Sequence, residues 1–194
     1  MDKLSLQQKQ QQFHEFFTIK HPVKVNMKPL DGDFVLPDQQ DLTEHMPYEF
    51  RVACEVSSIE ANALRPLRNL GEQAVDLVNF LKMQSRKIDL IMSIVLQQQD
   101  DETHRYTTLE FGGGGIKLVC NSPLEIESQA ELKLFLTEEA AAVFCYAEVI
   151  ACQAVDEQYH ISLIFTRIRE EDQELLVRAS LHLQTQQLKK RRHT

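Results

Sequence analysis

The sequence predicts a mainly β fold with added helices: a small antiparallel barrel or sandwich, a long helical segment before most of its strands, and a C-terminal helix. Five closely spaced runs after residue 102 alternate apolar and polar residues, which is typical of half-buried strands. The segment 48–99 repeats its apolar residues at helical spacing instead. The last segment begins with acidic and ends with basic residues, the arrangement that the helix macrodipole favours.

Composition limits the classes of protein to which the chain can belong. Its 194 residues, 43% of them hydrophobic, suffice for one large domain or one domain with an elaboration. The formal net charge of -8 argues against general electrostatic capture of nucleic acid or of an anionic membrane. The start of the chain lacks the apolar core of a signal peptide, and no apolar run reaches the ~18 residues of a membrane span. We therefore expect a soluble, cytoplasmic protein.

The N-terminal region predicts a short helix and then a strand. A glutamine-rich start reads as a frayed helix, and the following residues place Val23, Val25 and Met27 on one side of an extended chain. Lys24 and Asn26 alternate with them, so we expect these two side chains on the exposed side. Residues 31–41 contain Gly and Pro among acidic residues, which indicates an exposed connection.

A heptad seam dominates the helical segment. Pro66 marks a kink or a new first turn, and a helix over 67–97 follows it. A second apolar stripe lies on a neighbouring face, formed by Phe80, Met83, Leu90 and Ile94. Either the helix packs against its own N-terminal neighbour, or it self-associates as a coiled coil; one small body does not cover both stripes along ~45 Å. The seam residues, which we predict to mediate oligomerisation, are Leu67, Leu70, Ala74, Leu77, Leu81, Gln84, Ile88, Ile91 and Val95.

The second half of the chain predicts the remaining strands and the last helix. The expected strands are 105–111, 115–120, 131–136, 143–152 and 159–165. An alanine-rich stretch near residue 140 could also begin a helix. Because the C-terminal helix ends in the basic run 189–192, the macrodipole explains that run without a nucleic-acid or lipid partner.

The residues with chemical potential do not form a catalytic pattern. Three of the four cysteines lie in apolar strand-like runs, namely Cys120, Cys145 and Cys152. No two of the four, Cys54 included, have a CxxC spacing, so we expect reduced, structural thiols. The seven histidines are scattered, with no metal-ligand spacing. We therefore predict no catalytic residues, no metal site and no cofactor.

The run of glycines at 112–115 raises the question of a nucleotide loop. It is not a P-loop, because Lys117 is followed by Leu118 and a strand follows in place of a helix. It is not a dinucleotide fingerprint either, since the third glycine position falls on Lys117. Glycines here permit either a left-handed backbone or a close approach of another group to the chain.

The order of elements resembles the PilZ domain, a six-stranded barrel with a C-terminal helix that serves bacteria as a cyclic di-GMP receptor. The family's motif [D/N]-x-S-x-x-G aligns with Glu110 at the acidic position, Gly112 at the serine position and Gly115 at the glycine position. The R-x-x-x-R motif aligns with Lys20 and Lys24. The resemblance thus implies a candidate cyclic di-GMP site at these residues, in which lysines lack the planar forks of the arginines and the serine hydroxyl is lost.

The resemblance also implies a domain organisation and a function. Residues 13–36 and 102–194 would form a discontinuous barrel with its helix, and residues 40–99 would be a helical insertion. The leading prediction is a non-enzymatic, self-associating adaptor or scaffold of bacterial cyclic di-GMP signalling, with protein partners and weak or absent ligand binding. The alternatives are a genuine cyclic di-GMP receptor with an unconventional site and an unrecognised enzyme.

Overall fold

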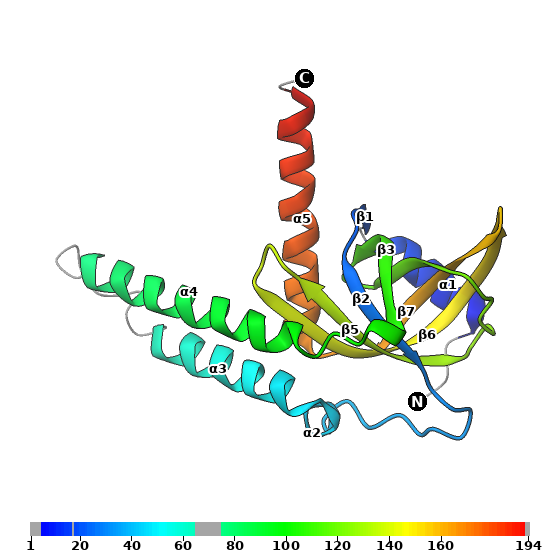
Figure 1. Cartoon of the computed structure of the whole chain (residues 1–194), viewed down its shortest axis with the longest axis horizontal. Coiled ribbons are helices and arrows are strands. Elements are labelled where there is room, and N and C mark those ends of the chain that lie inside the picture. The colour runs from blue at the N-terminus through cyan, green and yellow to red at the C-terminus, as the bar shows by residue number, and fades with distance from the viewer. Residues whose placement is uncertain (1–4, 17, 65–74, 193–194) are drawn as a thin grey trace.

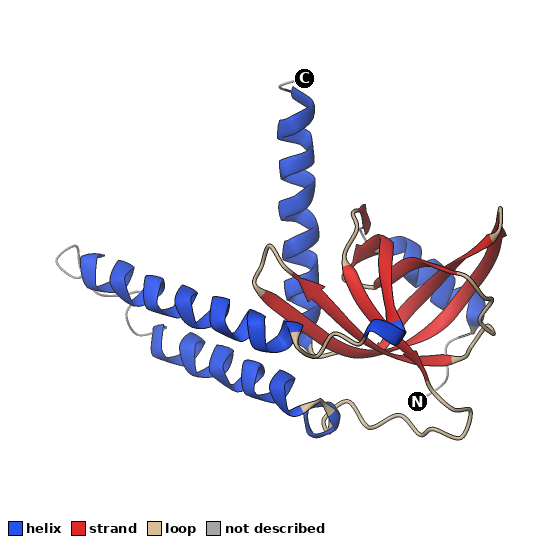
Figure 2. Ribbon diagram, viewed as in Figure 1, coloured by secondary structure: helices blue, strands red, loops and turns tan. Residues whose placement is uncertain are grey.

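The computed structural model describes residues 5–16, 18–64 and 75–192. Its strands form a closed antiparallel barrel, and helices extend from one side of it (Figure 2). Hydrogen bonding joins six strands in the order β3-β2-β5-β6-β7-β4, and β4 pairs back to β3 to close the barrel. A seventh strand, β1, pairs with the far end of β3. The strands are β1 (Thr18–Lys20), β2 (Lys24–Pro29), β3 (Arg105–Gly112), β4 (Gly115–Cys120), β5 (Gln129–Leu136), β6 (Ala141–Val155) and β7 (Gln158–Arg167).

The first expected strand is divided into β1 and β2 by a break opposite Thr108. The Thr108 hydroxyl donates to the carbonyl oxygen of His21 at 2.8 Å and accepts from the backbone N–H of Val23 at 2.9 Å. These two bonds replace part of the hydrogen bonding that a continuous ladder would supply. The apolar side of β2 is buried as predicted, but the prediction for Asn26 is wrong: its side chain is only 4% exposed, because it bonds to Asp100 and Asp101.

The barrel interior is closed at one end by α5 (Glu170–Arg192), the C-terminal helix. Leu176, Ala179 and Leu183 of this helix belong to the same buried cluster as the inward side chains of the strands, Val25 and Met27 among them. The acidic residues at the start of the helix lie at this end of the barrel, and its basic end points away from it (Figure 1).

The helical segment forms a hairpin that points away from the barrel (Figure 1). It consists of α2 (Leu42–His45), α3 (Tyr48–Leu64) and α4 (Val75–Gln97). Phe50 of α3 and Leu96 of α4 pack with Phe144 and Tyr146 of β6, and the ring centroids of Phe50 and Phe144 lie 5.9 Å apart. A 3-10 helix, Glu102–His104, then leads from α4 into β3.

The remaining predictions fare differently. The expected strands lie where the alternation places them, and the alanine-rich stretch forms a turn and the start of β6, not a helix. The seam helix ends at Gln97 as expected, whereas the expected helix start and its seam positions Leu67, Leu70 and Ala74 lie outside the described residues. The division into a discontinuous barrel and an insertion stays a prediction.

The glutamine-rich start forms a docked helix, α1 (Leu6–Glu15). Ser5 caps it, and the Ser5 and Gln8 side chains form a reciprocal capping box. Phe13 is 6% exposed and packs on Ile150 and Ile164 at the barrel surface. A helix of 10 residues is marginal alone in water, so this docking stabilises it.

Candidate functional site

The structure brings three of the five candidate ligand residues together on one ladder. Lys20 of β1 lies opposite Glu110 of β3, and Gly112 lies opposite Thr18 in the same pairing. Gly115 lies across the β3–β4 turn and pairs with Ile164 of β7. Lys20 and Glu110 are therefore cross-strand neighbours beside the glycine run.

The glycine run is needed for close packing within the chain. A Cβ atom on Gly114 would lie 2.5 Å from the Phe16 ring, and one on Gly113 would lie 2.5 Å from Val177 of α5. A Cβ atom on Gly115 would overlap the carbonyl oxygen of Leu163 and come within 2.8 Å of the Phe13 ring. No glycine in the described part of the chain has a positive φ, so the left-handed alternative does not apply. The group that approaches the glycines is the protein itself.

Lys24 lies apart from this group, in an ion-pair cluster centred on Asp100. Its Nζ lies 2.8 Å from Asp100 Oδ2, Arg105 Nη2 lies 2.8 Å from the same oxygen, and Asn26 Nδ2 donates to Asp100 Oδ1 at 2.9 Å. Burial disfavours the charged carboxylate, but the hydrogen bonds from Arg105, Lys24 and Asn26 outweigh it and lower the pKa of Asp100 to about 2. The cluster joins the chain just after α4 to β2 and β3.

A groove of about 720 Å³ runs along the outside of β3 beside Lys20. Its polar lining includes three side chains that the sequence prediction missed, namely Arg105, Asn121 and Gln158, together with His21. Arg105 is already engaged by Asp100 in this groove. No motif marks these residues, because they are distant in sequence and meet only when β3 pairs with β4 and β4 pairs with β7.

The cleft at the root of the hairpin, about 240 Å³, bears on the enzyme alternative. Cys54 of α3 accepts a hydrogen bond from Arg169, and Arg169 Nη1 lies 3.8 Å from Asp172 Oδ2. Burial raises the pKa of the Cys54 thiol, and burial also raises the pKa of Asp172 to about 6 against the opposing effect of Arg169. A raised thiol pKa opposes nucleophilic chemistry, and no histidine is among the described residues that line the cleft.

The seam of α4 is partly covered and partly free. Leu77, Ile88 and Ile91 are 55%, 46% and 61% exposed, whereas Leu81, Gln84 and Val95 of the same stripe are half-buried. The side of α4 that meets α3 carries Met92 and Leu96. The second stripe is also exposed, with Phe80 at 51%, Met83 at 60%, Leu90 at 47% and Ile94 at 60%. Both alternatives for this helix therefore describe part of it: one side packs within the chain, and the other has no cover in a single copy.

All four cysteines are free thiols, and three of them lie in β4 and β6. The described residues include no helix long and apolar enough to cross a membrane. They also include no group of three or more His, Cys, Asp or Glu side chains that could hold a metal ion.

These features define a small barrel protein in which a glycine hairpin lies beneath an N-terminal helix and a long helical hairpin extends from the barrel. The chain belongs to the PilZ domain family, whose model matches residues 82–182. The match confirms the resemblance that the order of strands and the glycine motif indicated. Among curated proteins, none matches the chain.

A solved structure shows the same fold over most of the chain, and others match part of it. A pathogenic protein from Xanthomonas campestris, described as a tetrameric PilZ domain self-assembled through a helical bundle, matches 92% of this chain and 96% of its own, with 14% identity and a TM-score of 0.53. The motility inhibitor MotI/DgrA of Bacillus subtilis matches over 42% of each chain at 20% identity, with a TM-score of 0.40. MrkH of K. pneumonia covers 46% of this chain and 44% of its own at 19% identity, with a TM-score of 0.39.

Proposed function

We propose that the protein is a non-enzymatic adaptor or scaffold of bacterial cyclic di-GMP signalling that self-associates through α4 and contacts other proteins. Membership of the PilZ family supports the signalling role. The observation that carries the scaffold role is the free apolar face of α4, which includes Ile88, Ile91 and Ile94. Monomeric soluble proteins rarely expose contiguous apolar patches of more than a few hundred Å².

The chemistry of this face fits a second copy of the same chain. Burial of large aliphatic and aromatic side chains yields about 25 cal/mol per Å² of apolar area, so covering this face favours association. Gln84 at the middle of the seam is half-buried, and one polar seam residue of this kind can fix the register of a helical bundle. The helical-bundle assembly of the Xanthomonas campestris protein, which shares this fold, supports the same role for α4.

The state of the candidate site supports weak or absent cyclic di-GMP binding. Asp100 already neutralises Lys24, and Glu110 lies opposite Lys20 on the neighbouring strand. Phe16 covers the glycine run at Gly114. A ligand phosphate would have to displace a carboxylate and an aromatic ring, and charge-assisted hydrogen bonds worth about 1.5–3 kcal/mol each would be lost in that exchange.

A receptor with an unconventional site is the second candidate, and the groove along β3 favours it. Lys20, His21 and Arg105 supply positive or ionisable groups there, and Asn121 and Gln158 supply amide donors. Calorimetric titration with cyclic di-GMP at low and at physiological salt tests this candidate. Micromolar binding that disappears in Lys20→Ala or Arg105→Ala would favour the receptor over the scaffold without ligand. A titration with no measurable heat would support the scaffold proposal.

The scaffold role is tested by two aspartates placed in the free face, Ile88→Asp with Ile91→Asp. Both side chains are exposed in a single copy, so the fold should survive while association is lost. The matched control, Asn79→Asp with Lys82→Asp, adds carboxylates at exposed polar positions of the same helix and should leave association unchanged. Sedimentation velocity at equal concentrations measures both. An assembly that persists in the first variant would refute the role of α4.

A further inference from the structure

Helix α5 carries a second apolar stripe, which begins at Val177 beside Gly113 of the β3–β4 turn and continues along the helix. Val177, Leu181 and Leu188 are 38%, 48% and 50% exposed, and Gln184 lies between the two leucines. These positions are spaced four, three and four residues apart, so they form one seam on the helix surface. The opposite side of the helix is the one that packs into the barrel.

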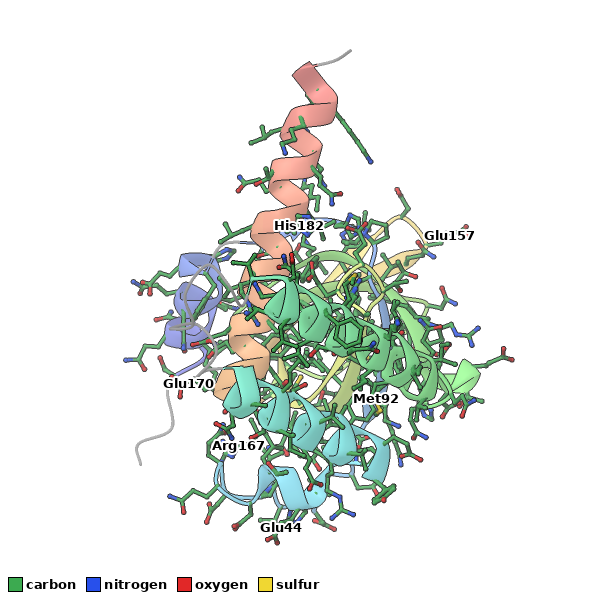
Figure 3. The ribbon with its side chains drawn as sticks, turned by 90° about the vertical axis from the view of Figure 1, so that its left-hand side faces the viewer. Glu44, Met92, Glu157, Arg167, Glu170 and His182 are labelled. Carbon is green, nitrogen blue, oxygen red and sulfur yellow. The ribbon has the colours of Figure 1, made fainter. Side chains whose placement is uncertain are left out.

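The C-terminal half of α5 extends past the barrel, to which Gln187 Nε2 ties it by donating to the Lys20 carbonyl oxygen of β1 at 3.0 Å. Figure 1 shows the helix rising above the barrel, and in Figure 3 the ribbon continues beyond His182 without another element beside it. With 23 residues at 1.5 Å each, the helix is about 35 Å long, so the seam continues past the end of the barrel. Among the described residues, Leu188 at this end of the seam keeps half of its surface exposed.

We propose that the seam of α5 is a homotypic interface, in which α5 packs antiparallel against α5 of a second copy. A four-three-four spacing is unchanged when the helix direction is reversed, so the two seams match each other about a two-fold axis. In this register Val177 lies opposite Leu188 of the second copy, and Leu181 lies opposite Gln184 of the second copy.

The charges beside the seam select the antiparallel direction. Glu170 and Glu174 lie on this side of the first turns, and Arg191 lies on the same side of the last turn. The antiparallel register places Glu174 opposite Arg191 of the second copy, twice per pair, whereas a parallel pair would place Glu174 against Glu174. A parallel pair would also bring both barrels to the same level, while the antiparallel pair places each barrel beside the free half of the other helix.

The start of the seam offers a receiving surface for the incoming leucine. A crevice of about 390 Å³ is lined by Phe16, Gln173 and Val177, with the charged side chains of Glu170, Glu174 and Arg178 around them. Leu188 of the second copy, opposite Val177, reaches this crevice, and Arg191 of the second copy reaches Glu174. Shape, apolar character and charge therefore converge at one place.

This interface is independent of the free face of α4 and has a separate consequence. Two different two-fold interfaces on one chain produce either a closed dihedral assembly or an extended chain of copies. The α5 seam is short, so on its own it gives a weak pair; association through α4 would strengthen it by raising the local concentration.

Oxidative cross-linking tests the direction of the pair. In Val177→Cys with Leu188→Cys, the two positions are eleven residues and about 16 Å apart on one helix, so they cannot bridge within a chain. Mild oxidation of this variant should produce links between Cys at 177 and Cys at 188 of another copy, identified by mass spectrometry of peptides. The native chain, oxidised in parallel, controls for Cys54 and Cys152. Links of 177 to 177 and 188 to 188, or none at all, would overturn the proposal.

Sedimentation of charge variants tests the interface in solution, in a background where Ile88→Asp and Ile91→Asp remove the α4 contact. This background should still dimerise at several hundred micromolar. Glu174→Arg or Arg191→Glu alone should weaken the dimer about tenfold, because each places like charges opposite each other at both ends of the pair. The two substitutions together should restore the dimer, because opposite charges then meet again at both ends. A background that stays monomeric, or single variants that change nothing, would refute the α5 interface without affecting the α4 proposal.

Discussion

Alanine substitutions along the glycine run should destabilise the protein to very different degrees, and Gly115→Ala should be the most damaging. Its Cβ atom would overlap the carbonyl oxygen of Leu163, a backbone atom of the adjoining strand β7. Relieving that overlap separates β4 from β7 and weakens nearby bonds such as the one from the Phe165 N–H to the Gly114 carbonyl, 3.0 Å long. Two or three such bonds at about 1 kcal/mol each, plus overpacking, amount to about 2–4 kcal/mol.

Gly113→Ala provides the matched comparison, because its Cβ atom would meet a side-chain carbon of Val177, which a small shift of the α5 side chain can move, and not a backbone atom. We expect a loss of about 1–2 kcal/mol, partly offset by the lower entropy of the unfolded alanine chain. Urea unfolding gives both free energies, and the melting temperature of the Gly115→Ala chain should fall by about 5–15 °C. If Gly115→Ala proved as stable as Gly113→Ala, the close packing at this run would not be the reason for its glycines.

Three further predictions concern charged groups. Asp100→Asn should lower the free energy of unfolding by about 1–2 kcal/mol at pH 7 and speed amide exchange in the residues after α4, whereas the control Glu102→Gln should change neither quantity appreciably. Because the pKa of Asp100 is depressed in the folded state, the difference in stability between Asp100→Asn and the native chain should vanish as pH falls from about 4 to 2. Asp172→Asn should be more stable than the native chain by about 1–3 kcal/mol at pH 8, and this advantage should disappear at pH 4, because the raised pKa of Asp172 favours its neutral form in the folded state. Urea unfolding at both pH values measures the advantage, and an advantage that is the same at pH 8 and pH 4 would contradict the prediction. Lys9→Ala should release α1, because Lys9 Nζ lies 2.6 Å from the nearly buried Glu148 carboxylate. Hydrogen exchange of residues 6–15 should be well above its level in the control variant Gln11→Ala, which changes an exposed side chain of the same helix. Equal exchange of these residues in the two variants would refute the prediction.

The strands could be predicted from the sequence because their signal is local. Alternation of apolar and polar residues places Val25, Met27 and the later strands correctly, and the glycine motif with the strand order led to the right family. The exposed face of α4 was also visible, since two apolar stripes on one helix exceed what a single neighbour can cover.

What the sequence did not show depends on contacts between distant segments. Asn26 alternates with buried residues and so reads as exposed, yet Asp100, more than 70 residues later, draws its side chain into a buried network. Likewise, nothing local tells that Phe16 lies on Gly114, so the glycines suggested a ligand or a turn before the structure placed an aromatic ring there. Lys24 matched a motif by spacing, but its Asp100 partner is set by the tertiary fold.

The molar mass of the native chain in solution tests the central claim most directly. One copy has a mass of 22.5 kDa, and the free face of α4 predicts a larger species at tens of micromolar, with a mass that is a whole multiple of this value. Light scattering coupled to size-exclusion chromatography measures it without a label. A single species of 22.5 kDa at that concentration would contradict a self-associating scaffold.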